Sequence, residues 1–434
     1  MKALRGRSVA ATALVVAVLA GVVIYVSGQR SEDNLIQGPY RSLLEASTDL
    51  GPASEQSIEV TASLTDTSRP TALIDWAQDR SLSVRWRPGD DWVVVEGPPS
   101  AVEQAFDVSV RDYRGRMGQL CYASPHQPEV PEHLRAEVAE MGRILSYTPH
   151  HMSMPDHIPL DVPDRGLGPA ALLNTYNADE LARNGVTGKG TTVVIFAFDG
   201  FRQSDLDLFT TTFGLPQFTP EVVGGSPGRP RGELSMDLQV AHALAPDARK
   251  VVVNARPTVE EGGGYRRIGE MLEDTDRRFP GAVWSFSIGW GCDKLITAAD
   301  LAPVRSALRT AQSHGTTAYN ASGDLAGMEC RGGQDWSSPP SEQDVGLDSI
   351  ASLPEMTSVG GTTLSTDEDG RWVSEQTWFD VPLSQGTGGG VSALFDLPPW
   401  QEAAADAVAP ERRTGKRMTP DIAAVADPLS LIHI

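Results

Sequence analysis

The pattern of hydrophobic and polar positions divides the chain into an apolar leader and two regions that differ in their succession of helix and strand patterns. Residues 9–26 form an uncharged stretch of 18 residues, and basic residues precede it. Such a stretch is long for the core of a signal peptide and just long enough to cross a bilayer. We therefore expect residues 1–29 to be an anchor or, as the second choice, a cleaved signal. Either way the rest would be exported, outside the cell or at its surface, and would meet membrane only through this segment.

Residues 35–147 mix strand and helix patterns as a small α+β domain does. The patterns fall at residues 57–64, 70–78, 82–86, 92–97, 100–106 and 108–113. Ser100 is followed three residues later by Glu103, which predicts a capping box at the helix start. The region contains no catalytic constellation. Residues 148–170 follow with five prolines and three histidines, His150, His151 and His157. This composition favours a proteolysis-prone linker over a metal site.

From residue 171 onward, helical and strand patterns alternate as in a doubly wound parallel sheet. Buried-strand patterns occur at residues 192–197, 250–254, 282–289 and 316–324. Ligands of such sheets bind beyond the carboxyl ends of the strands. Two segments of small residues, 287–289 and 320–324, lie at these ends. Asp324 is therefore a candidate site residue, although an aspartate after glycine also suits an ordinary turn.

A helix is predicted over residues 233–244, where helix-forming residues run unbroken up to Ala245 and Pro246. Glu233 and Asp237 are four residues apart in it, so both carboxylates project from one face and repel each other. Two interpretations follow. The pair is either a solvated acidic face, the common case for charged helices, or a buried pair that shares a proton.

Composition narrows the class of function. The chain has 57 acidic and 36 basic residues and a net charge of −21, which argues against nucleic acid as a partner. The eight histidines show no metal-ligand spacing, and the three cysteines form no CxxC. Glycine runs at residues 188–190 and 262–269 lack the preceding strand that nucleotide-binding loops need. Export permits a disulfide, and we expect Cys292 and Cys330 to form it, with Cys121 left over.

Six ordered motifs carry a resemblance to a known family. They are ExxxD before AP-x-A (Glu233 to Ala248), Ser-x-Gly (Ser287 to Gly289), Ala-Ser-Gly-Asp (ending at Asp324), Thr357-Ser-Val-Gly-Gly-Thr, Gly388-Gly-Gly-Val-Ser, and Thr419-Pro-Asp-Ile-Ala-Ala-Val-Ala-Asp-Pro. Together they resemble the sedolisins, the serine-carboxyl peptidases with a subtilisin-like fold. Residues 35–147 are similar to the family's pro-kumamolisin-type activation propeptide, which implies a ferredoxin-like domain, and residues 171–428 resemble its peptidase domain.

The resemblance implies an exported, acid-activated serine-type endopeptidase with protein or peptide substrates. Glu233 would be the general base, Asp237 would hold and tune it, and Asp324 would stabilise the oxyanion. The propeptide would block the site as an intramolecular inhibitor. The segments expected to bind the substrate backbone contain Ser287, Gly289, Gly388, Gly389 and Gly390.

The family's nucleophile is not found. It lies in a Gly-Thr-Ser segment beyond the last motif, and no Gly-Thr-Ser occurs in these residues. The family's calcium ligands lie later still, so calcium is expected only of a complete domain. We expect the peptidase domain to be incomplete and residues 429–434 to be an artefactual tail. The alternative is a catalytically inactive binding protein with a peptidase fold.

Overall fold

The structure is a computed structural model that describes residues 34–115, 118–148, 150, 167–260, 262–331, 341–367, 369–380, 385–407 and 413–427. The predicted leader at residues 1–29, most of the predicted linker, with His151 and His157, and the tail at residues 429–434 lie outside these ranges. None of the helices in the described ranges is long and apolar enough to cross a bilayer. The anchor therefore stays a prediction.

The first region contains a ferredoxin-like unit. Four antiparallel strands have the spatial order β3-β4-β2-β7, with helices α3 and α4 in the connections. The elements are β2 (Ile58–Leu64), α3 (Thr71–Gln78), β3 (Ser83–Arg85), β4 (Trp92–Gly97), α4 (Pro99–Phe106) and β7 (Val138–Met141). Alternate residues of β2 are buried, as the polar-apolar alternation predicted. This arrangement confirms the α+β prediction.

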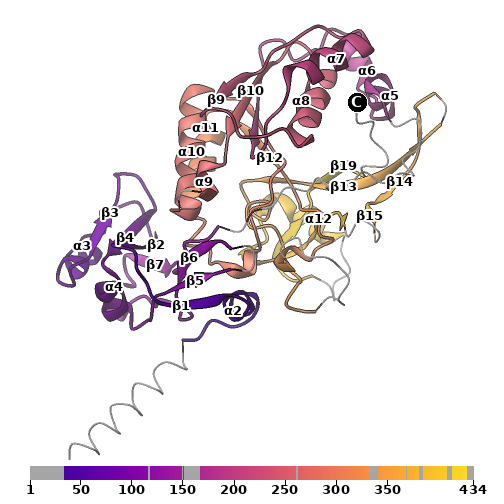
Figure 1. Ribbon diagram of the computed structural model, residues 1–434. Helices are drawn as coiled ribbons and strands as arrows, with labels where there is room; N and C mark the ends of the chain where they lie inside the picture. Colours follow the sequence, from indigo (N-terminus) through magenta and orange to yellow (C-terminus); the bar gives the residue numbers. More distant parts are fainter. Residues whose placement is uncertain are drawn as a thin grey trace, which may run out of the picture.

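Smaller elements complete this region (Figure 1). They are α2 (Pro39–Glu45), β1 (Thr48–Pro52), β5 (Arg111–Arg114), β6 (Leu120–Ala123) and η1 (Glu132–Leu134). The capping box predicted at Ser100 is wrong. Helix α4 begins at Pro99 after Pro98, and its N-cap makes no side-chain hydrogen bond. Proline suits the first helical position, and the Glu103 carboxylate accepts instead from Val110 N at 2.8 Å.

The second region is built on a large, mainly parallel sheet of order β14-β13-β12-β11-β8-β10-β9, in which β19 also pairs with β13. Its strands are β8 (Thr192–Ala197), β9 (Glu221–Val223), β10 (Arg249–Asn254), β11 (Val283–Phe286), β12 (Thr317–Ala321), β13 (Thr357–Thr366), β14 (Trp372–Thr377) and β19 (Ile422–Val425). Only β14 runs antiparallel to its neighbour. Short pairs are formed by β15 (Phe379–Asp380) with β16 (Gln385–Gly386) and β17 (Gly390–Asp396) with β18 (Lys416–Thr419).

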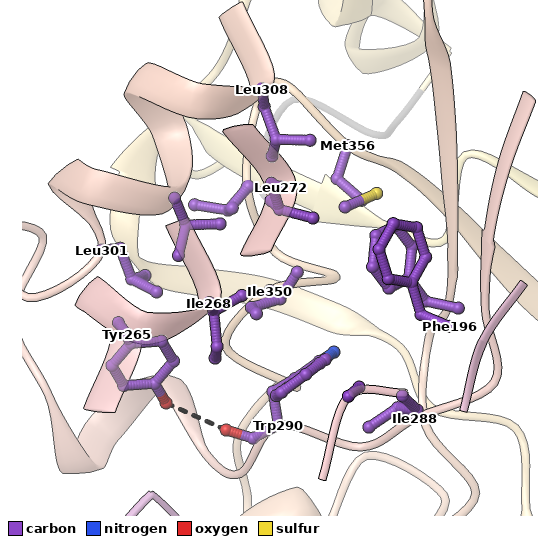
Figure 2. Close-up of a cluster of buried hydrophobic side chains, with 14 of the residues drawn as sticks. Phe196, Tyr265, Ile268, Leu272, Ile288, Trp290, Leu301, Leu308, Ile350 and Met356 are labelled. Carbon is purple, nitrogen blue, oxygen red and sulfur yellow. Dashed lines mark hydrogen bonds between the residues drawn. The ribbon is translucent and has the colours of Figure 1, made fainter. Parts of the chain in front are cut away.

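Helices cover both faces of this sheet, which confirms the doubly wound prediction. Val194 and Phe196 of β8 belong to the core shared with α10 (Gly264–Arg278) and α11 (Ala302–Ser313), as Figure 2 shows around Phe196. The alternate residues Ile195 and Ala197 pack with Leu206 and Leu234 in a second core. Those two leucines lie on α7 (Gln203–Phe213) and α8 (Glu233–Leu244). The remaining helical segments are α5 (Pro169–Thr175), α6 (Asp179–Arg183), α9 (Pro257–Glu260), η2 (Asp293–Leu295), η3 (Glu329–Arg331), η4 (Pro399–Gln401) and α12 (Glu402–Asp406).

The first region contacts the second through α10, α11 and the segment between β11 and α11. Arg87 pairs with Glu273 at 2.6 Å, Arg309 with Asp91 at 2.5 Å, and Arg266 with Glu59 at 3.2 Å. A backbone group also makes a hydrogen bond across this interface, because Arg143 N donates to Asp300 Oδ1 at 3.1 Å. Ionic contacts between oppositely charged side chains therefore make up much of the polar part of this interface.

Candidate active site

Helix α8 has the predicted bounds, Glu233 to Leu244. Gly232 precedes it with a φ of 115°, a backbone conformation that favours glycine. The side chains are not placed as on a solvated face. Glu233 is only 9% exposed and Asp237 is partly buried. The interpretation of an ordinary acidic surface is therefore wrong for this pair, because burial of a carboxylate is unfavourable unless other groups compensate.

Asp237 is joined to the end of strand β11. The Ser287 hydroxyl donates a hydrogen bond to Asp237 Oδ1 at 3.1 Å. Burial raises the pKa of Asp237 to about 7, the charge of Asp199 raises it further, and the Ser287 hydrogen bond opposes this rise. Below that pH the folded protein therefore keeps a proton on Asp237.

Asp199 is a site residue that the sequence reasoning missed. Its side chain is 3% exposed, and its Oδ2 accepts a hydrogen bond from Arg231 N at 3.1 Å, just before α8 begins. Burial raises its pKa. The missed signal was positional: Asp199 follows the buried strand β8, at the same kind of strand end that marked Asp324.

Sheet topology brings the carboxyl groups to one edge. Strands β12, β11 and β8 are adjacent and parallel, with Phe196, Phe286 and Asn320 in register. Asp199 and Asp324 follow the outer two of these strands, while Ser287 follows the central one. The three side chains therefore emerge at the carboxyl edge, where parallel sheets bind ligands.

The loop that carries Asp324 is tied to the glycine segment 388–390. Gly388 N donates to Gly323 O at 2.6 Å, and Ser322 Oγ donates to Gly388 O at 2.8 Å. A Cβ atom at Gly388 would lie 2.2 Å from Ser322 O, so only glycine fits there. Gly388, Gly389 and Gly390 also line a cavity of about 290 Å³ together with β13 and the cis Thr419–Pro420 bond. The predicted backbone-binding segments thus lie beside Asp324.

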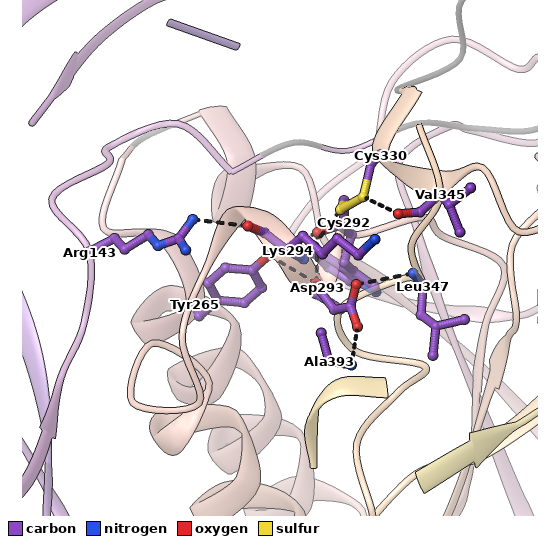
Figure 3. The surroundings of a disulfide bond; sticks show 11 residues. Arg143, Tyr265, Cys292, Asp293, Lys294, Cys330, Val345, Leu347 and Ala393 are labelled. Atoms are coloured by element: carbon purple, nitrogen blue, oxygen red, sulfur yellow. Dashed lines mark hydrogen bonds between the residues drawn. A yellow bond between two sulfur atoms is a disulfide. The ribbon is translucent and has the colours of Figure 1, made fainter. Parts of the chain in front are cut away.

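A disulfide braces the same edge (Figure 3). Cys292 and Cys330 are bonded with their Cα atoms 4.7 Å apart, and Cys121 remains a partly buried thiol whose pKa burial raises to about 11. The expected bond between Cys292 and Cys330 and the expected unbonded Cys121 are both confirmed.

Asp293, next to this disulfide, accepts hydrogen bonds from Leu347 N at 3.1 Å and Ala393 N at 3.0 Å. Among the described residues, Cys292, Asp293 and Cys330 are the one group that could hold a metal. Sulfurs joined in a disulfide do not suit calcium, which prefers oxygen.

Comparisons with known proteins match both regions. Residues 56–141 match the model of the Pro-kumamolisin activation domain. Kumamolisin of Bacillus sp. (strain MN-32) is 29% identical over 365 residues, covering 77% of this chain and 61% of the relative. Sedolisin of Pseudomonas sp. (strain 101) is 26% identical over 350 residues, covering 76% of this chain and 57% of the relative.

A solved structure, Pseudomonas sedolisin (serine-carboxyl proteinase) complexed with two molecules of pseudo-iodotyrostatin, shares 24% identity at a TM-score of 0.49. The alignment covers 61% of this chain and 72% of that one. The chain spans about 60% of the length of the two curated relatives, which are covered to 61% and 57%. The activation-domain match and the two relatives support a sedolisin-family peptidase with a pro-kumamolisin-type propeptide.

Proposed function

We propose that this chain is the major part of a serine-type endopeptidase of the serine-carboxyl class, made as an exported zymogen and activated by acid. The observation that carries the proposal is the partly buried Asp237, which holds a proton up to a pH of about 7 beside Ser287 and Asp199. A helix built only for stability has no use for two like charges four residues apart, one buried and one partly buried. A catalytic pair that operates in acid needs that placement.

In the proposed reaction, a serine oxygen attacks the carbonyl carbon of the peptide, and its proton moves to Glu233 as general base. The new C–O bond leaves negative charge on the former carbonyl oxygen, and protonated Asp324 donates a hydrogen bond to it. Glu233 then returns the proton to the leaving amine as the C–N bond breaks. Asp237 keeps Glu233 in place and adjusts its proton affinity.

Substrate would lie along the edge formed by Ser287, Gly289 and the segment 388–390. Backbone groups of these residues can pair with an extended peptide, as main-chain recognition of peptides requires. The nucleophilic serine is not in these residues, which contain no Gly-Thr-Ser. We propose that the serine and the calcium ligands of the family are encoded beyond residue 428. Peptides and the chain's own propeptide are the proposed partners, and no role for nucleic acid is proposed.

Activation would begin at the interface between the two regions. The arginine–carboxylate pairs Arg87–Glu273, Arg309–Asp91 and Arg266–Glu59 cross it. Acid protonates carboxylates in general, so ion pairs of this kind are weaker at low pH. Weaker docking would expose the linker after residue 148 to cleavage. The mature enzyme would act outside the cell or at its surface.

The test uses the extended protein, by which we mean residues 1–428 followed by whatever the gene encodes after them. It is incubated at about pH 4 and at pH 7, and its mass and the hydrolysis of a denatured protein substrate are followed. We expect loss of the propeptide mass and hydrolysis at pH 4 only. Glu233→Gln is the matched control, which keeps size and removes the base. An intact mass with no hydrolysis would instead support the alternative, a catalytically inactive binding protein.

A further inference from the structure

The loop that carries Asp324 rests on a buried acid that the proposed reaction does not use. Glu329 is 2% exposed, and its Oε1 accepts a hydrogen bond from Leu325 N at 3.1 Å. Gly323, on the other side of Asp324, has a φ of 114°, and a Cβ atom there would lie 2.3 Å from the same oxygen. The Glu329 carboxyl therefore fills the space directly beneath residues 323–325 and fits only a glycine at position 323.

The position of Glu329 is itself fixed. It opens the short helix η3, and the next residue, Cys330, is bonded to Cys292 in the segment after β11. On its other side the Asp324 loop is tied to β16, because Gly386 N donates to Asp324 O at 2.8 Å and Ala326 N donates to Gly386 O at 2.9 Å. The loop is thus clamped between Glu329 and the segment that leads to Gly388, and a change in either support would shift Asp324.

The charges around Glu329 favour its neutral form. Burial, the charge of Asp348 and the charge of Asp324 raise the pKa of Glu329 well above its ordinary value. Asp348 is fully buried, and its carboxylate accepts hydrogen bonds from Trp290 N, Ile350 N and Ala351 N. Arg331, in the same helical turn, is paired with Asp344 at 4.0 Å. Glu329 is therefore a neutral acid in the pH range of the proposed activity, and its ionisation at higher pH would add a second charge beneath Asp324.

We propose that Glu329 is a positioning residue, which in its neutral form holds the loop 323–325 so that Asp324 meets the oxyanion. The proposal rests on the proposed peptidase function. It predicts that activity depends on the side-chain carbonyl oxygen at position 329 and does not depend on the ability of that side chain to ionise. Glu329→Gln keeps an acceptor for Leu325 N without the charge, and Glu329→Ala removes the acceptor and leaves space beneath the loop.

The first experiment measures kcat and KM of the extended protein at pH 4. We expect Glu329→Gln to stay within about twofold of the wild type, and Glu329→Ala to lose about 10- to 100-fold in kcat with little change in KM, as a displacement of about 1 Å can do. Glu342→Gln, the same change at an exposed position outside the loop between Cys292 and Cys330, is the control. Equal losses in Glu329→Gln and Glu329→Ala, or full activity in Glu329→Ala, would overturn the proposal.

The second experiment needs no activity. Thermal unfolding of the 434-residue chain is followed between pH 4 and pH 7.5. Because a raised pKa favours the protonated folded state, the wild type should lose stability as the pH rises, and Glu329→Gln should lose less of it while matching the wild type at pH 4. Identical pH dependence in both chains would overturn the neutral-acid role. If the extended wild type hydrolyses nothing, the proposed function fails, and this profile alone decides whether Glu329 supports the loop as a neutral acid.

Discussion

Ser287 Oγ lies 3.1 Å from Asp237 Oδ1 and links the end of the central strand β11 to the second turn of helix α8. The hydrogen bond stabilises the ionised form of Asp237 against the burial that raises its pKa. One hydroxyl therefore sets part of the proton affinity of the carboxyl next to the proposed base.

Replacement of Ser287 by alanine removes the hydrogen bond that lowers the pKa of Asp237. Asp237 should then hold its proton to a higher pH, so the alkaline limb of the pH–kcat/KM profile of the extended protein should move upward. Ser313→Ala, at an exposed position at the end of α11, is the control. An unshifted alkaline limb in Ser287→Ala would show that Asp237 does not govern that limb.

Stability should rise on mild acidification. Burial raises the pKa of Asp300 to about 6 and the pKa values of Asp237 and Asp348 to about 7, whereas their ordinary value is 3.8. A carboxyl with a raised folded-state pKa binds its proton more tightly when folded, so its destabilising effect is full above the folded pKa and fades as pH falls towards 3.8. We expect a melting temperature several degrees higher at pH 5 than at pH 7.5. A lower melting temperature at pH 5 would contradict this expectation.

His242 should act in the opposite direction. It is fully buried, its Nε2 lies 2.7 Å from Pro216 O, and burial and the charge of Lys250 lower its pKa below 6.5. The folded state therefore resists protonation, and this contribution reduces stability as pH falls below 6.5. His242→Gln keeps a donor for Pro216 O without that titration. Relative to that of the wild type, its melting temperature should rise as the pH falls from 7 to 5.

The interface pair Arg87–Glu273 should contribute modestly to propeptide docking. Two hydrogen bonds, at 2.6 and 2.9 Å, join the guanidinium to the carboxylate. Glu273→Gln should weaken association of the cleaved propeptide about two- to fivefold at pH 7, the range expected for a partly exposed pair. Asp274→Asn is the matched control, because Asp274 pairs only within α10 among the contacts of the described residues. Equal affinities of Glu273→Gln and wild type would remove this pair from the account of activation.

The disulfide should support both stability and the Asp324 loop. Cys292 and Cys330 are separated by 38 positions, and a bridge across such a loop stabilises a fold by about 2–4 kcal/mol. The double change Cys292→Ser and Cys330→Ser should reduce the free energy of unfolding by about that amount in urea. Cys121→Ser, which removes the unbonded thiol, should have less effect. A larger loss in Cys121→Ser than in the double variant would contradict this prediction.

Sequence alone determined the features that depend on neighbouring residues. Unbroken helix formers before Ala245 and Pro246 set the bounds of α8, since proline cannot continue a helix. Alternating patterns predicted the small α+β domain and the parallel sheet. The spacing of Glu233 and Asp237 placed them on one face, but it did not separate a solvated pair from a buried one. A local pattern also misled at Ser100, where Pro99 starts the helix instead.

Tertiary structure decided which distant groups meet. Strand β8 lies between β11 and β10, an order different from their order in the chain, and this places Asp199 beside Asp237. The same order brings Ser287 to Asp237. Glu329 reaches the loop of Asp324 through a turn and a disulfide that no periodicity encodes. Burial and proton affinity are set by long-range packing, so the chemistry of this edge depends on contacts that a local sequence pattern does not contain.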